Sequence, residues 1–300
     1  MTMQTAGKVF VVTGAGNGIG RQVAVELIAQ GATVAAVDIN ENGLRQTVSE
    51  AGLRPSGDEA GLRPTGSEEG SRISTHVLDV SDGDAVAAFP QVVLDAHGVV
   101  DGLFNIAGIA QDFESTSGIT PERIDQIMAV NFHGTVAMTR AFLPHLAERP
   151  DGGRVMLTSS LSALVPVPGA AVYGASKAAI AYFGYGLAQD LRRQCPSVKA
   201  TTVIPGTIWT DIVRNSAQTM GVPVAVAKTF AMPARKAAKR MISSTMKGRT
   251  SVVIGKDAHV YRTLQRVSSV LAERVSYIQV GTFVYRGNAG ELSGGTDSRP

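Results

Sequence analysis

Short apolar runs alternate along this chain with longer segments that have helical periodicity. Seven strand-like segments are predicted, at residues 9–12, 33–37, 73–78, 103–104, 154–157, 200–204 and 251–254, and the first of them is a continuous apolar run. Between them, apolar positions three and four residues apart predict helices, at about residues 21–30, 82–97, 121–147, 173–194 and 233–247. Strands that alternate with helices indicate βαβ units. The pattern therefore predicts an α/β fold with one doubly wound parallel sheet of about seven strands, covered by helices on both faces.

Three segments depart from this rhythm. Residues 50–58 (EAGLRPSGD) and 59–67 (EAGLRPTGS) form a tandem duplication, which we interpret as a surface loop insertion over about 51–70. Residues 256–280 carry apolar positions near helical spacing and predict a C-terminal helical extension. Such a helix could dock on its own domain, on another subunit or on a membrane surface. Residues 281–300 predict a flexible tail.

Composition narrows the functional classes only modestly. The chain has 300 residues, of which 44% are hydrophobic and 18% charged, as in ordinary globular proteins. Lys and Arg (28) exceed Asp and Glu (25) by only 3, so no nucleic-acid partner is expected. The single cysteine, Cys195, lies before a proline at a predicted helix end and is interpreted as structural rather than nucleophilic. The five histidines show no metal-ligand spacing, so no metal is expected.

The N-terminal residues do not resemble a signal peptide, because their apolar run is too short and leads into glycines. No apolar stretch is long enough for a transmembrane helix. We therefore expect a cytoplasmic protein without a transmembrane segment, while peripheral membrane contact stays open.

A glycine-rich turn joins the first predicted strand to the first helix. Residues 13–20 read TGAGNGIG, so Gly14, Gly18 and Gly20 fit the pattern T-G-x-x-x-G-x-G. A dinucleotide pyrophosphate must approach backbone N–H groups at a helix N-terminus, and a Cβ would keep it away. A turn of this kind after a buried strand predicts a Rossmann-type dinucleotide site.

Asp38 ends the second strand, 18 residues after Gly20. A carboxylate at this place accepts hydrogen bonds from an adenosine ribose and repels a 2′-phosphate, which favours NAD over NADP. The alternative is that Asp38 caps the helix that begins near Glu41.

A candidate catalytic pair lies at the start of a later helix. Tyr173 and Lys177 are four residues apart, which places them on one helix face. An ammonium beside a phenol is expected to lower the pKa of the tyrosine, which then becomes a usable general acid or base. Ser160, just past the fifth strand, could donate a hydrogen bond to a developing alkoxide.

Taken together, these motifs resemble the short-chain dehydrogenase/reductase family, over about residues 6–255. The matching pieces, in the family's order, are residues 13–20, Asp79 and Val80, the N-I-A-G of residues 105–108, Asn131, Ser160, Y-x-x-x-K at 173–177, and residues 205–207. The family's spacing favours Ser160 over its neighbour Ser159. Ile106 and Ala163 depart from the family's usual residues, although neither removes a reacting group.

The resemblance implies a role for each matching residue. Tyr173 would exchange a proton with the substrate oxygen, Lys177 would hold the nicotinamide ribose, Ser160 would polarise the carbonyl, and Asn131 would hold a water in a proton relay. Besides Tyr173 and Lys177, the implied cofactor contacts are Gly14, Asn17, Gly18, Ile19, Gly20, Asp38, Ile39, Asp79, Val80, Asn105, Ala107, Gly108, Pro205, Gly206, Ile208 and Thr210. A homodimer or homotetramer is implied, through the helices at 121–147 and 173–194.

The family places a variable substrate lid at about residues 208–232. Here the lid contains apolar residues, which are Trp209, Ile212, Val213, Met220, Val222, Val224 and Phe230. They favour a hydrophobic secondary alcohol or ketone, although they could equally serve to pack the lid on the core. We thus expect an NAD-dependent oxidoreductase. The alternatives are a non-catalytic NAD sensor or scaffold, and a lyase or epimerase that uses NAD transiently.

Overall fold

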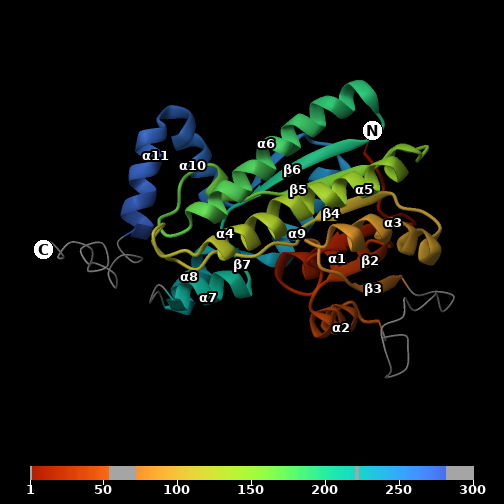
Figure 1. Cartoon of the computed structure of the whole chain (residues 1–300), viewed down its shortest axis with the longest axis horizontal. Coiled ribbons are helices and arrows are strands. Elements are labelled where there is room, and N and C mark those ends of the chain that lie inside the picture. The colour runs from red at the N-terminus through yellow and green to blue at the C-terminus, as the bar shows by residue number, and fades with distance from the viewer. Residues whose placement is uncertain (1, 54–71, 220–222, 282–300) are drawn as a thin grey trace, which may run out of the picture.

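The computed structural model describes residues 2–53, 72–219 and 223–281 (Figure 1). Its main sheet has seven parallel strands in the order β3-β2-β1-β4-β5-β6-β9. The strands are β1 (Val9–Thr13), β2 (Thr33–Asp38), β3 (Ile73–Val77), β4 (Gly102–Asn105), β5 (Arg154–Thr158), β6 (Lys199–Pro205) and β9 (Ser251–Ile254). The order reverses between β1 and β4, as in doubly wound sheets, so the predicted fold class is confirmed.

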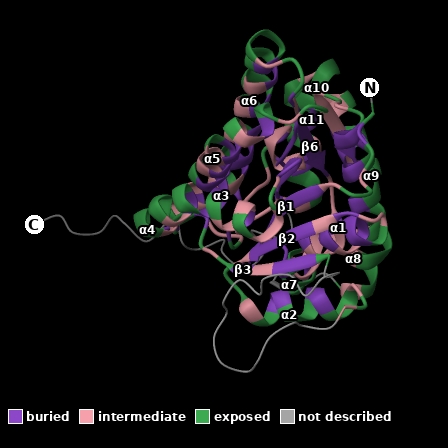
Figure 2. Ribbon diagram, turned by 90° about the vertical axis from the view of Figure 1, so that its right-hand side faces the viewer, coloured by how far each residue is buried: buried purple, intermediate pink, exposed green. Residues whose placement is uncertain are grey.

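Helices cover both faces of this sheet. They are α1 (Gly18–Ala29), α2 (Glu41–Glu50), α3 (Gly83–His97), α4 (Pro121–Met128), α5 (Thr135–Ala147), α6 (Ala171–Gln194) and α9 (Ala234–Met246). Along β1, Phe10 and Val12 face the core shared with α1, α2 and α9, whereas Val11 faces the core shared with α3, α5 and α6. Figure 2 shows the buried strands between these two layers. Because both faces are covered, the central strand β1 is buried at every position and apolar from Val9 to Val12, which is the pattern seen in the sequence.

The helix predicted over 121–147 is continuous in direction but not regular. A π-helical turn, η1 (Ala129–Gly134), joins α4 to α5. Such turns insert one extra residue into a helix and are frequent at functional sites. Here the turn contains Asn131.

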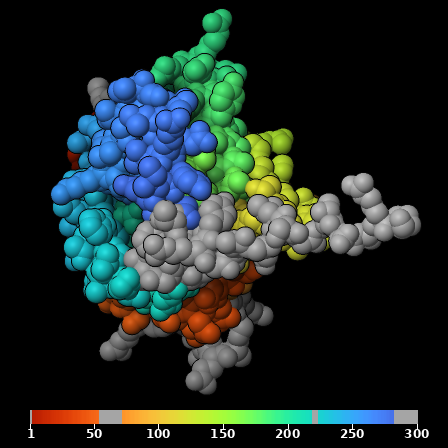
Figure 3. All heavy atoms as spheres, turned by 90° about the vertical axis from the view of Figure 1, so that its left-hand side faces the viewer, coloured from red at the N-terminus to blue at the C-terminus, as the bar shows by residue number. Residues whose placement is uncertain are grey.

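The C-terminal extension is two helices rather than one, α10 (Lys256–Val267) and α11 (Ser269–Ser276), followed by a π turn, η3 (Tyr277–Gly281). Ser268 breaks the predicted helix because its backbone is extended and its side chain caps α11 by accepting from the Leu271 N–H at 3.2 Å. Both helices lie at one end of the molecule (Figure 3). Tyr261 and Ala272 pack on Val165. Of the three docking alternatives (its own domain, another subunit or a membrane surface), the structure therefore shows the extension docked on its own domain.

The lid region is a small layer of its own. It comprises β7 (Ile208–Trp209), α7 (Asp211–Thr219), α8 (Val224–Phe230) and β8 (Met232–Pro233), with β7 paired to β8. Ile212 is 52% exposed and Phe230 82%, so these two side chains do not serve to pack the lid on the core. Residues 54–70 of the predicted insertion, residues 282–300 of the predicted tail, Met220 and Val222 lie outside the described residues.

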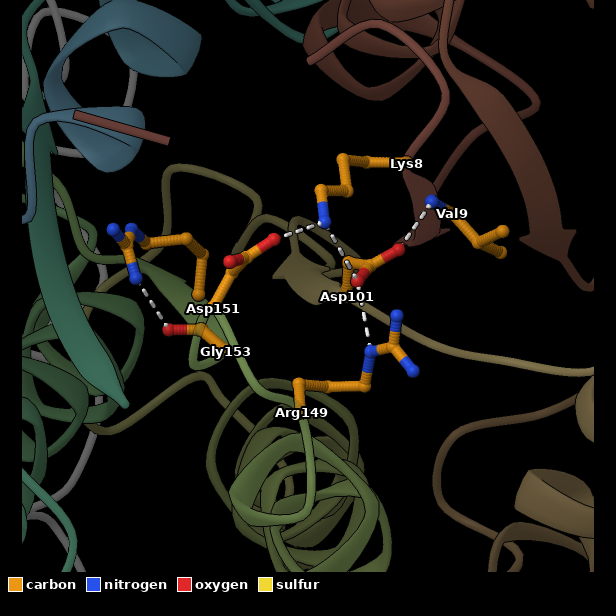
Figure 4. A network of polar contacts seen from close by, with 7 residues as sticks. Lys8, Val9, Asp101, Arg149, Asp151 and Gly153 are labelled. Carbon is orange, nitrogen blue, oxygen red and sulfur yellow. Dashed lines mark hydrogen bonds and ion pairs between the residues drawn. The ribbon is translucent and has the colours of Figure 1, made fainter. Parts of the chain in front are cut away.

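At the amino ends of the strands, a buried carboxylate ties three elements together (Figure 4). Asp101, which is 1% exposed, accepts from the Val9 N–H and from Arg149 Nε, both at 2.9 Å. Lys8 Nζ lies 3.7 Å from the same carboxylate and 2.8 Å from Asp151. This network is structural, because sites of open α/β sheets form at the opposite, carboxyl edge. In the described part of the chain, we find no helix with the length and apolarity that a membrane span requires.

Candidate active site

The glycine-rich turn is fixed to the loop after β4 by one hydroxyl. Thr13 Oγ1 accepts from the N–H groups of Ile106 and Ala107, at 3.0 and 3.1 Å. Gly14 has φ +68°, and a Cβ there would lie 2.8 Å from the Ala107 nitrogen. Only glycine fits this close approach of two backbones. The turn and the loop after β4 are therefore held in one arrangement.

The same turn leads into α1, and its glycines keep side chains away from the backbone N–H donors at the start of this helix. Asn17 caps the helix by accepting from the Gly18 N–H at 2.7 Å, and its amide donates to Asp211 of the lid at 3.0 Å. A Cβ on Gly20 would lie 2.0 Å from the Gly14 carbonyl oxygen. The following N–H groups of the first turn have no intrahelical partner, so they remain for an anion. This cradle, which Cβ atoms would fill, fits a dinucleotide pyrophosphate.

Asp38 lies at the carboxyl end of β2, beside the turn. Its carboxylate accepts from the Gly16 N–H at 2.8 Å and from the Asn40 N–H at 2.9 Å. The cap of α2 is Asn40, whose side chain accepts from the Gly43 N–H at 3.0 Å, so the alternative that Asp38 caps this helix is wrong. Asp38 instead ties β2 to the glycine turn and stays partly exposed, while Ile39 is 67% exposed.

Asp79 and Val80, expected to contact adenine, follow β3. Asp79 is exposed, and its carboxylate accepts from both the N–H and the hydroxyl of Ser81, at 2.8 and 2.7 Å. Val80 is buried against the π turn, since a Cβ on Gly134 would lie 2.8 Å from its side chain. Val80 thus packs against Gly134 of the π turn, and its contact with adenine stays a prediction.

Asn105 ends β4, and Gly108 lies in the loop that follows it. Asn105 is buried and donates to Thr139 Oγ1 at 3.1 Å. A Cβ on Gly108 would lie 3.0 Å from Asn131 Oδ1 and 3.1 Å from Lys177 Nζ. Gly108 therefore leaves room between the amide and the ammonium. A larger residue would have to displace one of them.

The candidate catalytic side chains meet where β5 ends and α6 begins. The Ser160 hydroxyl lies close enough to the Tyr173 hydroxyl to favour its phenolate form and lower its pKa. Ser160 also caps a short 3-10 helix, η2 (Leu161–Ala163), by accepting from the Ser162 N–H at 3.2 Å. The neighbouring Ser159 is buried and donates to the Lys177 carbonyl at 2.7 Å. Of the two serines, only Ser160 is therefore placed beside the tyrosine.

Lys177 and Tyr173 lie on one face of α6, as their spacing predicts. Lys177 Nζ is 5.7 Å from the centre of the Tyr173 ring and donates to the Thr158 carbonyl at 3.2 Å. Burial lowers the pKa of Lys177 from 10.5 to about 8. Burial raises the pKa of Tyr173, and the neighbouring Ser160 hydroxyl opposes this rise only in part. The net shift of the tyrosine pKa in the chain alone is therefore upward, opposite to the direction expected from the lysine, because desolvation of the phenol is the largest cause.

Asn131 uses its side chain to join a loop to α6. Its Oδ1 accepts from the Ile109 N–H at 2.8 Å, and its Nδ2 donates to the Ile109 carbonyl at 3.1 Å and to Ser176 Oγ at 3.0 Å. Ser176 in turn donates to the Tyr173 carbonyl at 2.7 Å. The amide is therefore connected to the tyrosine backbone through one hydroxyl, and its implied role in a water relay stays a prediction.

Sequence reasoning missed Gln111. It is buried, and its Oε1 accepts from the N–H groups of Val172 and Tyr173, at 3.0 and 3.1 Å. Ala170, the residue directly before α6, provides no side-chain cap for this helix. Gln111 thus caps the helix from another loop, 61 and 62 residues away in sequence. The one available signal was the absence of Ser, Thr, Asp or Asn at the start of this helix.

Asp257 was also missed. Its carboxylate accepts from the Thr207 N–H at 2.6 Å, and a Cβ on Gly206 would lie 2.2 Å from it. The first turn of α10 therefore fixes the loop of residues 205–207, after which Ile208 is buried and Thr210 lies 3.3 Å from the Cβ position of Gly18. This contact joins the two ends of the site. No feature of the sequence relates Asp257 to that loop.

Comparison with known proteins agrees with this geometry. The family model described as short chain dehydrogenase matches residues 8–221. The putative oxidoreductase SadH of Mycobacterium tuberculosis is 32% identical over 286 residues, which cover 92% of this chain and 96% of that protein.

Solved structures share the fold. A levodione reductase superposes with a TM-score of 0.72 and 24% identity, covering 85% of this chain and 99% of that one. A short chain dehydrogenase from Mycobacterium paratuberculosis, bound to NAD, has a TM-score of 0.69 and 24% identity, with 86% and 100% covered. The chain therefore belongs to the short-chain dehydrogenase/reductase family of oxidoreductases.

Proposed function

We propose that this protein transfers a hydride between NAD(H) and a hydrophobic secondary alcohol or ketone. The observation that carries the proposal is the arrangement of three side chains. The Ser160 hydroxyl lies beside the Tyr173 hydroxyl and acts to lower its pKa, and the Lys177 ammonium lies 5.7 Å from the ring. A sensor or scaffold protein would need the glycine turn but no buried acid with a matched donor beside it.

The cofactor in this proposal is held by the glycine turn, Asp38 and Lys177. The donors of the first turn of α1 receive the pyrophosphate, and the partly exposed Asp38 accepts from the adenosine ribose. The same carboxylate disfavours a 2′-phosphate, which supports NAD over NADP. When bound, the nicotinamide supplies or accepts the hydride.

The chain's own groups handle the proton and the oxygen. Because burial raises the pKa of Tyr173, its resting form is the neutral phenol, which can donate a proton to an oxygen that gains negative charge. The Ser160 hydroxyl stabilises that same oxygen. The Lys177 ammonium favours the phenolate that is left after donation, and reversing these steps serves oxidation of an alcohol.

Apolar residues follow Ser160 in the chain, and they bear on the class of substrate. Leu161, directly after it, packs against the C-terminal helices through Val165 and Tyr261. Ser276 of α11 donates to the Pro166 carbonyl at 2.7 Å, which fixes the loop that follows Ser160. With the exposed Ile212 and Phe230 of the lid, these apolar contacts support a hydrophobic substrate. We also propose a homodimer or homotetramer through α5 and α6, since Tyr182 on α6 is 83% exposed.

The test is NADH formation with a panel of hydrophobic secondary alcohols, and NADH consumption with the corresponding ketones. Tyr173→Phe should lose turnover while it still binds NAD, whereas Tyr182→Phe, on the same helix but exposed, should retain turnover. Absence of NAD binding by the unaltered protein would refute the cofactor assignment. NAD binding without turnover in either direction across the panel would refute the proposed substrate class.

A further inference from the structure

Positive charge is concentrated in one stretch of this nearly neutral chain. Residues 212–256 contain nine Lys and Arg and no Asp or Glu, although the whole chain has a net charge of only +3. The nine are Arg214, Lys228, Arg235, Lys236, Lys239, Arg240, Lys247, Arg249 and Lys256. Separation of charge on this scale indicates an anionic partner more specifically than the net charge does.

The fold gathers part of this charge around one open cavity of about 480 Å³ between α9, β9 and α10. Six basic side chains line it, which are Lys239, Arg240, Lys247, Arg249, His259 and Arg262. Ser243, Ser244 and Ser251 add hydroxyls, and Val252, Val253 and Ile254 complete the lining. No acidic residue lines the cavity. The strand β9 is at the edge of the sheet, next to β6, and Figure 2 shows α9 and α10 on the same side of the molecule as β6.

The cations of this cavity are barely neutralised by the protein. Lys239 lies 3.7 Å from Glu26. In the part of the chain that the structure describes, Arg240, Lys247, Arg249 and Arg262 take part in no ion pair. Like charges held together in a concave surface repel one another, and a bound anion relieves that repulsion.

The donors suit phosphate better than a carboxylate. Arginine and lysine bind phosphate oxygens by charge-assisted hydrogen bonds, and serine hydroxyls add neutral donors. One carboxylate would offset a single charge, whereas a phosphate carries up to two and a pyrophosphate more. The concave shape also favours a compact group over an extended polymer.

We propose that the cavity between α9, β9 and α10 binds a phosphate-bearing ligand, either a free phosphate compound or the headgroup of an anionic lipid. The site is separate from the glycine turn, which lies between β1 and α1. It does not depend on the function proposed above. The competing explanation is that the charges only protect the edge strand β9 from pairing with another chain.

Isothermal titration with inorganic pyrophosphate tests the free ligand, and co-sedimentation with phosphatidylcholine vesicles, with and without phosphatidylglycerol, tests the lipid. Arg240→Gln/Lys247→Gln removes two charges from the cavity. Lys236→Gln/Arg193→Gln removes two exposed charges that do not line it and is the matched control. The variants are compared at the same salt concentration, after calorimetry has shown that their melting temperatures equal that of the unaltered protein.

We expect the cavity variant to bind one of the two probes at least about tenfold more weakly, and the control variant to bind it as the unaltered protein does. Loss of pyrophosphate binding assigns a free phosphate compound, and loss of sedimentation with phosphatidylglycerol alone assigns a lipid headgroup. Pyrophosphate bound at the glycine turn would be equal in all three proteins. Equal binding in all three proteins, or binding to neither probe, would overturn the proposal.

Discussion

Replacing Lys177 by methionine should make the chain without cofactor more stable while it abolishes turnover. The two side chains have similar length, so the main change is the loss of a buried ammonium. Lys177 is 4% exposed, and burial lowers its pKa from 10.5 to about 8. At about 1.4 kcal/mol per pKa unit, keeping this group charged at pH 7 costs about 3 kcal/mol.

Part of this gain is offset, because the variant loses the hydrogen bond from Nζ to the Thr158 carbonyl. Such a bond contributes about 1 kcal/mol, so the net stabilisation is about 2 kcal/mol. In a protein of this size that raises the melting temperature by about 4 °C. Differential scanning calorimetry at pH 7, without added nucleotide, measures it.

The difference should also depend on pH. Since the pKa is depressed in the folded chain, the unfolded chain binds more protons between pH 8 and 10.5, and the stability of the unaltered protein rises with pH there. The advantage of Lys177→Met should therefore shrink as pH rises from 8 towards 10.5. Lys236→Met, at an exposed position of α9, should show no such dependence. A variant that is less stable than the unaltered protein at pH 7, or a difference that is constant with pH, would refute the reasoning.

Three further predictions concern residues around the site and in the core. Gln111→Leu leaves the N–H groups of Val172 and Tyr173 without their acceptor, so kcat should fall about tenfold and the free energy of unfolding by about 1–3 kcal/mol. Gln111→Glu keeps an acceptor and should retain most of the kcat of the unaltered protein. Equal kcat in all three proteins would contradict a positioning role. Asp101→Leu breaks the buried network of Figure 4 and should cost about 3 kcal/mol in urea unfolding without changing kcat, because the network lies at the far edge of the sheet. Burial, and secondarily the charge of His97, lowers the pKa of His76 from 6.5 to about 4. The stability that this group contributes above pH 6.5 should therefore decline by about 3 kcal/mol as the pH falls to 4. The variant His76→Phe should lack this part of the decline.

The sequence alone was sufficient for the main sheet and the order of its elements. A central strand such as β1 is buried on both faces, so its apolar run is continuous and easy to recognise, and all seven predicted segments are strands of one parallel sheet. The glycine turn was equally readable, because a backbone position that excludes Cβ, such as Gly14 or Gly20, leaves a direct mark in the sequence. The pair of Tyr173 and Lys177 followed from helical spacing.

Other features did not follow from the spacing of residues along the chain. The break at Ser268 depends on a local cap that competes with an otherwise helical pattern. Gln111 and Asp257 fix the backbone at Tyr173 and Thr207 from loops and helices that no spacing rule connects to them.

The acid–base character of the centre was also decided by tertiary structure. The spacing of Tyr173 and Lys177 predicts that the ammonium lowers the pKa of the phenol, but burial of both groups raises the pKa of the tyrosine and lowers that of the lysine. Sequence determined which residues meet, because periodicity and backbone exclusion are local. Only the tertiary structure determined the direction of their pKa shifts, because desolvation depends on every segment that covers them.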